Sequence, residues 1–221
     1  MEKDFSKIIK TVKSEQLGIN LDDGLFLVEH IKSINPEIII ESGRARGVST
    51  EIFAKCFPEK LIISIDFDKN SQNSKYSEKK LKKYKNVKIV YGDSREIIFK
   101  YLKNKKAHVF IDGPKGHEAI LLSKKVFENE NVISISLDDF PKNTYYTNIL
   151  ESIFGNIQKS YQSFNKQGRA VIIDKKTSKI NKQAFKNYIN WFEQIRPFYT
   201  KWTYKLKPGL LTKLLGVFNK E

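Results

Sequence analysis

The sequence predicts a doubly wound α/β fold whose seven-stranded sheet is mostly parallel. Five short apolar runs, rich in β-branched residues, alternate with segments of helical periodicity. Such runs are typical of strands buried on both faces by covering helices. Two further strand-like segments follow so closely that they must pair as an antiparallel hairpin.

The apolar runs place the five parallel strands at residues 38–40, 61–65, 87–91, 107–111 and 132–136. The hairpin strands are expected around residues 160–164 and 169–173. Asn165-Lys166-Gln167-Gly168 would form the short turn between them.

Helical periodicity occupies the remaining intervals. We expect helices around residues 5–12, 20–31, 52–57, 75–85, 119–127, 145–154, 184–195 and 210–218. Pro197 should end the helix over 184–195, because proline supplies no backbone N–H. We therefore divide the chain into N-terminal helices (1–34), an α/β core (35–176) and a basic helical extension (177–221) that packs on or beside the core.

Composition predicts a folded cytoplasmic protein. The 221 residues suffice for one domain, and 40% of them are hydrophobic. No apolar run is long enough to cross a bilayer, and the first residues do not resemble a signal peptide. The single cysteine, Cys56, excludes an internal disulfide and a cysteine-based zinc cluster within one chain.

The formal net charge of +15 raises the question of an anionic partner. Lysine predominates over arginine, the residue that binds phosphate bidentately, so we favour a generally lysine-rich composition over nucleic-acid binding. An apolar stripe within 208–219, flanked by lysines, could lie on the inner face of a membrane. Docking on the domain is the alternative that we favour, and a homo-oligomer contact stays open.

The segment after the first strand has the features of a nucleotide-type ligand loop. The chain passes from Glu41 through Gly43 and Gly47 into a helix that begins near Ser49. Glycines let a ligand approach the backbone, and a helix N-terminus attracts an anionic group. Asp66 ends the second strand, where a carboxylate commonly holds ribose hydroxyls.

These residues resemble the motifs of class I S-adenosylmethionine (SAM)-dependent methyltransferases. Glu41-x-Gly43-x-x-x-Gly47 is similar to their motif I, Ile65-Asp66 to the ribose position, and Gly92-Asp93-Ser94 to the loop beside adenine. The resemblance covers about residues 20–175 and implies a Rossmann-like fold. It also implies that SAM is held by Glu41, Gly43, Gly47, Ser49, Asp66 and Asp93.

Ile111-Asp112-Gly113 and Asp138-Asp139 resemble the small-molecule O-methyltransferases of the catechol and macrolide-sugar types. In the metal-dependent members, acids at these positions carry the metal. The resemblance thus implies that Asp112, Asp138 and Asp139 hold Mg²⁺ or another divalent cation. Three ionised carboxylates cannot lie close together unpaired, so Lys115 or protons could neutralise them instead.

The catalytic candidates are Asp112, His117 and Lys115, the last two as alternative general bases. His117 lies later than the histidine of sugar-modifying relatives, and a structural role at a helix start is the alternative. The favoured reaction is O-methylation of a small hydroxylated acceptor such as a sugar.

Three other functions stay open. A nucleic-acid methyltransferase fits the charge, but Asp112-Gly113-Pro114 lacks the usual base-methylation motif. A non-catalytic SAM-binding protein is another alternative. A nicotinamide-dependent oxidoreductase is disfavoured, because the loop lacks G-x-G-x-x-G spacing. The role of Arg44 and Arg46 in the loop stays unexplained.

Overall fold

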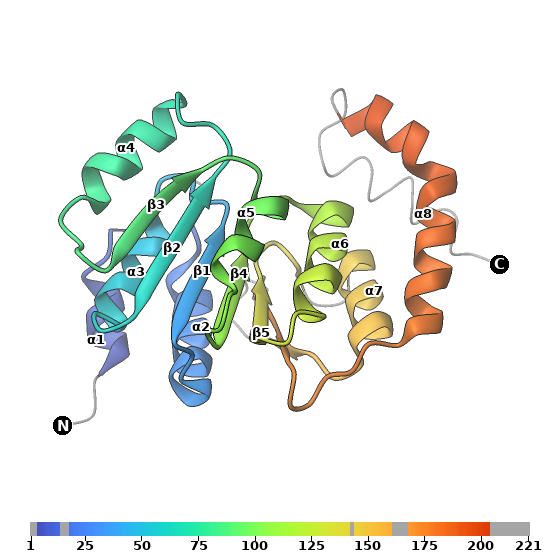
Figure 1. Ribbon diagram of the computed structural model, residues 1–221, viewed down its shortest axis with the longest axis horizontal. Coiled ribbons are helices and arrows are strands. Elements are labelled where there is room, and N and C mark those ends of the chain that lie inside the picture. The colour runs from blue at the N-terminus through green and yellow to red at the C-terminus, as the bar shows by residue number, and fades with distance from the viewer. Residues whose placement is uncertain (1–3, 14–17, 142–143, 161–167, 204–221) are drawn as a thin grey trace.

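The computed structural model describes residues 4–13, 18–141, 144–160 and 168–203, with side chains described as far as Arg196. An open seven-stranded sheet forms its centre, with helices on both faces (Figure 1). The strands are β1 (Ile38–Ser42), β2 (Leu61–Asp66), β3 (Val87–Tyr91), β4 (Ala107–Ile111), β5 (Val132–Leu137), β6 (Gln158–Lys159) and β7 (Val171–Asp174).

The strand order is β3-β2-β1-β4-β5-β7-β6. Neighbours among β1 to β5 pair in parallel, whereas β7 runs antiparallel to both β5 and β6. The predicted fold class is therefore confirmed. The chain reverses its winding direction between β1 and β4, and such a switch point opens a crevice beyond the carboxyl ends of the strands.

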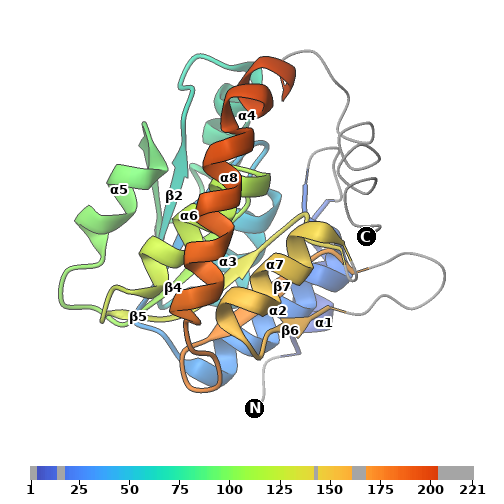
Figure 2. The same cartoon turned by 90° about the vertical axis from the view of Figure 1, so that its right-hand side faces the viewer.

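Helices cover the sheet in two layers (Figures 1 and 2). Ile39 of β1 packs into one apolar layer with α1, α2 and α3, and its neighbours Ile38 and Ile40 pack into the other with α5, α6, α7 and α8. The helices are α1 (Phe5–Lys10), α2 (Leu21–Ile34), α3 (Val48–Cys56), α4 (Gln72–Leu81), α5 (Ser94–Tyr101), α6 (Gly116–Phe127), α7 (Tyr145–Phe154) and α8 (Lys182–Thr203).

The two hairpin strands pair antiparallel, as predicted. β6 ends at Lys159 and β7 begins at Val171. Residues 161–167, which include most of the first predicted strand and of its turn, lie outside the described part. Beside this ladder, the buried carboxylate of Asp23 in α2 accepts the hydroxyl of Ser160 and the backbone N–H of Arg169.

The expected helix end at Pro197 is wrong, because α8 continues to Thr203. Proline removes one intrahelical hydrogen bond, and a helix can absorb that loss by bending slightly. The predicted helix over 210–218 lies outside the described residues. None of the described helices is long and apolar enough to span a bilayer.

Candidate functional site

Two cavities open at the carboxyl ends of the central strands. The smaller, about 350 Å³, is lined by Gly43, Ile65, Asp66, Phe67, Gly92, Asp93, Ser94, Arg95, Gly113 and Pro114. The larger, about 600 Å³, is lined by Gly18, Gly43, Ala45, Asp66, Ser71, Asn73, Asp112, Lys115, Asp138, Asp139 and Arg169. The two cavities share the walls formed by Gly43 and Asp66, so ligands bound in them would lie next to each other.

Gly43 brings the loop after β1 against the loop after β4. Its φ is +88°, and a Cβ at this position would lie 2.5 Å from the backbone nitrogen of Gly113. The Ser42 carbonyl accepts hydrogen bonds from the N–H groups of Asp112 (2.8 Å) and Gly113 (2.9 Å). Glycine is therefore required at position 43, which is one of the two loop positions where we expected a ligand to approach the backbone. Gly47 precedes α3 with φ +72°.

Asp66 lies at the boundary of both cavities. Its Oδ2 accepts the backbone N–H of Ala45 at 2.8 Å, which leaves Oδ1 for a ligand. The adjacent Phe67 lines the smaller cavity with 77% of its surface exposed, which is unusual for so large an apolar side chain. Phe67 was not predicted from the sequence, although its position directly after a strand-ending acid is a usable signal.

Asp93 lines the smaller cavity and also caps α5. Its Oδ1 accepts the backbone N–H of Arg95 at 2.9 Å, and its Oδ2 pairs with the Arg95 guanidinium at 2.6 Å. The bond from Arg95 lowers the pKa of Asp93. The second residue that sequence reasoning missed here is Arg95, which also reaches Glu118 at 3.5 Å.

Glu41 and Ser49, two predicted cofactor contacts, line neither cavity. Glu41 is fully buried and accepts the hydroxyls of Ser49, Thr50 and Ser64. Burial raises its pKa, while the three hydroxyl bonds act in the opposite direction. Glu41 lies on the same side of β1 as Ile39, facing α3. The hydrogen bonds from Ser49 and Thr50 to Glu41 thus fasten the start of α3 to β1.

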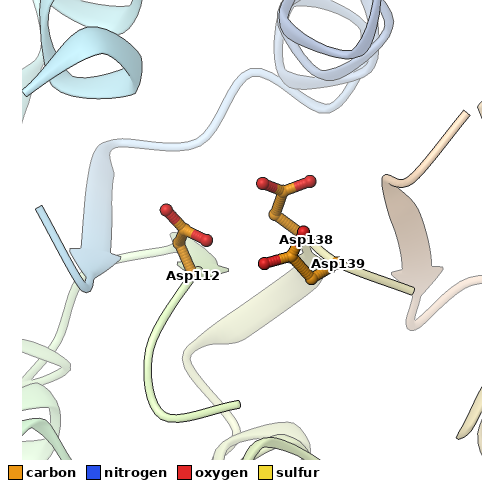
Figure 3. Close-up of side chains that lie close together, drawn as sticks. All are labelled: Asp112, Asp138 and Asp139. Atoms are coloured by element: carbon orange, nitrogen blue, oxygen red, sulfur yellow. The ribbon is translucent and has the colours of Figure 1, made fainter. Parts of the chain in front are cut away.

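Asp112, Asp138 and Asp139 converge as predicted (Figure 3). Each offers one oxygen, and these oxygens lie within 4.8 Å of one another. Two cations enter the cluster. Lys115 contacts Asp112 and lies 2.6 Å from Asp139, and Arg169 contacts Asp139 and lies 3.5 Å from Asp138. We call these five residues the carboxylate cluster.

Asp138 is the most buried acid of the cluster, at 3% exposure. Burial, followed by the charges of Asp112 and Asp139, raises its pKa to about 7. Burial also raises the pKa of Asp112 against the effect of Lys115. Burial acts to lower the pKa of Lys115, but the carboxylates outweigh it and raise that pKa. Lys115 is therefore an ammonium at neutral pH.

The donor set fits a hard divalent cation. All three side chains supply carboxylate oxygens, the ligands that Mg²⁺ prefers. Oδ1 of Asp138 is buried and accepts no hydrogen bond within the described residues. Two internal cations against three carboxylates also leave one negative charge to be balanced, by a proton or by an ion.

His117, a predicted general base, is enclosed by aromatic side chains, although it follows Lys115 by only two residues. It is fully buried beneath α8, where its Nδ1 lies 2.9 Å from the Tyr188 hydroxyl and its ring packs against Tyr146 and Phe192. Burial lowers its pKa to about 4. It lines neither cavity, so its surroundings favour the structural alternative.

No family model matches the sequence, and no curated protein matches it. Similar solved structures include a putative caffeoyl-CoA O-methyltransferase from Staphylococcus aureus, at 19% identity and TM-score 0.51, covering 77% of this chain and 89% of that one. A putative O-methyltransferase from Klebsiella pneumoniae has 13% sequence identity and a TM-score of 0.52, covering 80% of this chain and 88% of that one. The O-methyltransferase TomG from Streptomyces achromogenes, in complex with SAM, has 12% sequence identity and a TM-score of 0.54, covering 79% of this chain and 91% of that one. The chain therefore has the fold of the class I SAM-dependent methyltransferases.

Proposed function

We propose that this protein is a SAM-dependent methyltransferase that binds its cofactor in the smaller cavity. The observation that carries the proposal is the wall of that cavity, where Gly43, Asp66 and Asp93 follow three different strands of one sheet edge. Asp66 would bind the ribose hydroxyls, and the exposed ring of Phe67 would cover one face of the adenine. The N-terminus of α3 would attract the methionine carboxylate.

The acceptor would occupy the larger cavity, beside the methyl group. Direct transfer forms a bond from the acceptor oxygen to the methyl carbon, breaks the carbon–sulfur bond, and releases S-adenosylhomocysteine and a proton. Lys115 would hold Asp112 and Asp139 in place, and a cluster carboxylate would take up the proton. A divalent ion held by Asp112, Asp138 and Asp139 would, when bound, lower the pKa of the acceptor hydroxyl.

The wall of the larger cavity supports a hydrophilic acceptor. Every described residue of that wall is charged, polar, glycine or alanine. A flat aromatic acceptor would call for apolar side chains, whereas a sugar presents hydroxyls that carboxylates and amides can bind. O-methylation of a small polyhydroxylated compound such as a sugar therefore fits this site best.

Isothermal titration calorimetry tests the cofactor. We expect S-adenosylhomocysteine to bind the purified protein in a 1:1 complex, and NADH not to bind. Asp66→Asn should weaken the binding by about tenfold or more, because a charge-assisted hydrogen bond is lost. Asp68→Asn is the matched control, since Asp68 lies in the same loop but lines neither cavity. A folded protein that does not bind S-adenosylhomocysteine would refute the proposal.

Titration with Mn²⁺, followed by electron paramagnetic resonance, tests the metal. We expect the wild-type protein with bound S-adenosylhomocysteine to bind one Mn²⁺, and Asp138→Asn to lose most of that affinity. Glu118→Gln, outside the cluster, should bind Mn²⁺ as the wild type does. If the wild type binds no Mn²⁺ at millimolar concentration, a proton rather than an ion balances the remaining negative charge of the cluster, and metal assistance is wrong.

A nucleic-acid acceptor is the second candidate, favoured by the net charge of +15. It requires RNA or DNA affinity that falls steeply with salt concentration and competes with a small acceptor. A non-catalytic SAM-binding protein would give the same calorimetry. It is distinguished by the absence of S-adenosylhomocysteine production with every acceptor tried.

A further inference from the structure

A charged side chain is buried beneath the cofactor loop. Arg44 lies between the two loop glycines, and only 1% of it is exposed. Taking a guanidinium out of water is unfavourable unless hydrogen bonds replace the lost hydration. A buried arginine at this place therefore calls for a specific set of contacts.

Those contacts join the loop to three elements. Arg44 Nε donates to Ser77 Oγ of α4 at 3.0 Å, and Nη1 donates to the carbonyl of Ser64 in β2 at 3.0 Å. The guanidinium carbon lies 4.8 Å from the centre of the Tyr91 ring in β3. The Ser77 hydroxyl in turn donates to the Ser74 carbonyl at 3.0 Å, which fixes the direction of its lone pairs toward Arg44.

The loop that Arg44 fastens is sterically unfavourable. Ala45, the next residue, has a φ of +45°, a conformation that side chains with a Cβ seldom adopt. In this conformation the Ala45 N–H points to Asp66 Oδ2 at 2.8 Å, and the Gly47 N–H closes a turn onto the Arg44 carbonyl at 2.8 Å. The surrounding structure must hold this arrangement, and the buried contacts of Arg44 join this loop to α4, β2 and β3.

We propose that Arg44 is a positioning residue for the cofactor site. By fastening the loop to α4, β2 and β3, it presets the Ala45 N–H, and through it the Asp66 carboxylate, before the cofactor arrives. This inference rests on the proposed function, since it assigns Asp66 to the cofactor ribose. A loop that is already ordered loses less conformational entropy on binding, so preorganisation increases the affinity for the cofactor.

Arg46, two residues along, provides a matched comparison. Its guanidinium carbon lies 4.5 Å from the centre of the Tyr76 ring, which is 40% exposed. Arg46 itself is partly buried, whereas Arg44 is almost fully enclosed. The same substitution at the two positions separates the effect of the buried contacts from the effect of a positive charge near the loop.

Calorimetry with S-adenosylhomocysteine on Arg44→Lys, Arg44→Met and Arg46→Lys provides the first test. We expect both Arg44 variants to lose affinity by tenfold or more, because lysine keeps the charge but cannot donate to Ser77 and Ser64 while stacking on Tyr91. Arg46→Lys, at a position that is less buried, should lose less affinity than Arg44→Lys. Folded Arg44 variants with wild-type affinity would overturn the inference, as would rescue by lysine.

Amide hydrogen exchange provides the second test, on the loop itself. We expect the amides of residues 43–47 to exchange at least tenfold faster in unliganded Arg44→Met than in the wild type, and S-adenosylhomocysteine to restore protection. Unchanged exchange would overturn the inference. If Arg44→Met does not fold, Ser77→Ala removes a single contact and should show the same changes in smaller degree.

The two proposals fail in different ways. A wild type that does not bind S-adenosylhomocysteine refutes the cofactor assignment, while the exchange comparison still measures whether Arg44 orders the loop. A wild type that binds, beside Arg44 variants that bind equally well, leaves the cofactor assignment standing and refutes the positioning role.

Discussion

The pKa of Glu51 in α3 depends on the side chains that surround it. Its side chain is 6% exposed and lies 3.3 Å from Lys55, 3.0 Å from Lys80 and 3.5 Å from Lys83. The Tyr84 hydroxyl donates to it at 2.7 Å. Burial acts to raise its pKa, but the bonds from Tyr84 and Lys80 outweigh burial and lower the pKa to about 2.

We expect Glu51→Gln to lower the free energy of unfolding by about 2 kcal/mol at pH 7, because the lysines lose their buried partner. A depressed pKa stabilises the fold above the ordinary value of 4.5, and that contribution is lost as the pH falls toward 2. Urea denaturation should therefore show the variant approaching the wild type over this range. A difference that does not depend on pH would contradict the role of the charge.

Lys83→Gln serves as the control for this prediction. The Lys83 side chain is 63% exposed, and exposed ion pairs contribute about 0–1 kcal/mol. Its removal should therefore change the free energy of unfolding much less than Glu51→Gln does.

At the residue scale, sequence patterns identify which residues end strands but not where their side chains point. Gly43 and Asp66 were predicted at the cofactor site, and the structure places them on the cavity walls. Glu41 comes from the same motif yet faces α3, because side chains alternate between the two faces of a strand. Phe67 gives no periodic signal, since a single aromatic residue in a loop has no repeating neighbours.

At the element scale, α8 lies beside α6 and α7 (Figure 2). Aromatic contacts around His117 join the three helices. Tyr188 and Phe192 of α8 stack with each other, at an interplanar angle of 7°, and both contact the His117 ring. Tyr145 and Tyr146 of α7 meet the same ring edge to face. Protonation of His117 would place a charge among these rings.

The double variant His117→Phe/Tyr188→Phe tests this docking. The pKa of His117 is lowered to about 4, so in the wild type this residue costs stability as the pH falls from 6.5 toward 4. The double variant should lack that loss and gain about 2 kcal/mol relative to the wild type between pH 7 and pH 5. Chemical denaturation at the two pH values measures it. An unchanged difference would mean that His117 is not enclosed by α8.

His30 and His108 do not disturb this comparison. Burial lowers the pKa of both, so they too cost stability as the pH falls. Both stay in the wild type and in the double variant, and they pair with Ser134 and Ser136 of β5. Their contributions therefore cancel in the difference.

A helix or strand can be predicted from the sequence when residues within that segment determine where it begins and ends. The strands β1 to β5 were predicted within two residues, because β-branched runs and burial on both faces act together. Most of the hairpin strand predicted over 160–164 lies outside the described residues, and its partner β7 was predicted within two residues. The short helix α5 was not predicted, and it begins at the cap formed by Asp93. Helix α8 continues past Pro197 to Thr203, so the local signal of one proline did not predict where this helix ends.

At the scale of the whole molecule, the fold was predictable and the larger cavity was not. Winding direction and strand order follow from the alternation of strands and helices. The cavity wall, in contrast, assembles residues from Gly18 to Arg169, and no sequence pattern indicated that Arg169 would enter the carboxylate cluster. The proposed division at residues 34 and 176 stays a prediction, as do the oligomeric state, the partners and the cellular location.

The wall that Gly43 and Asp66 form between the two cavities also bears on energetics. A ligand that orders a shared wall from one side changes the surface offered to the other. Binding free energies are linked, so whatever factor the cofactor applies to acceptor affinity, the acceptor applies equally to cofactor affinity. If the two cavities bind cofactor and acceptor as proposed, the two binding events would be coupled through this wall, and each affinity would depend on the occupancy of the other cavity.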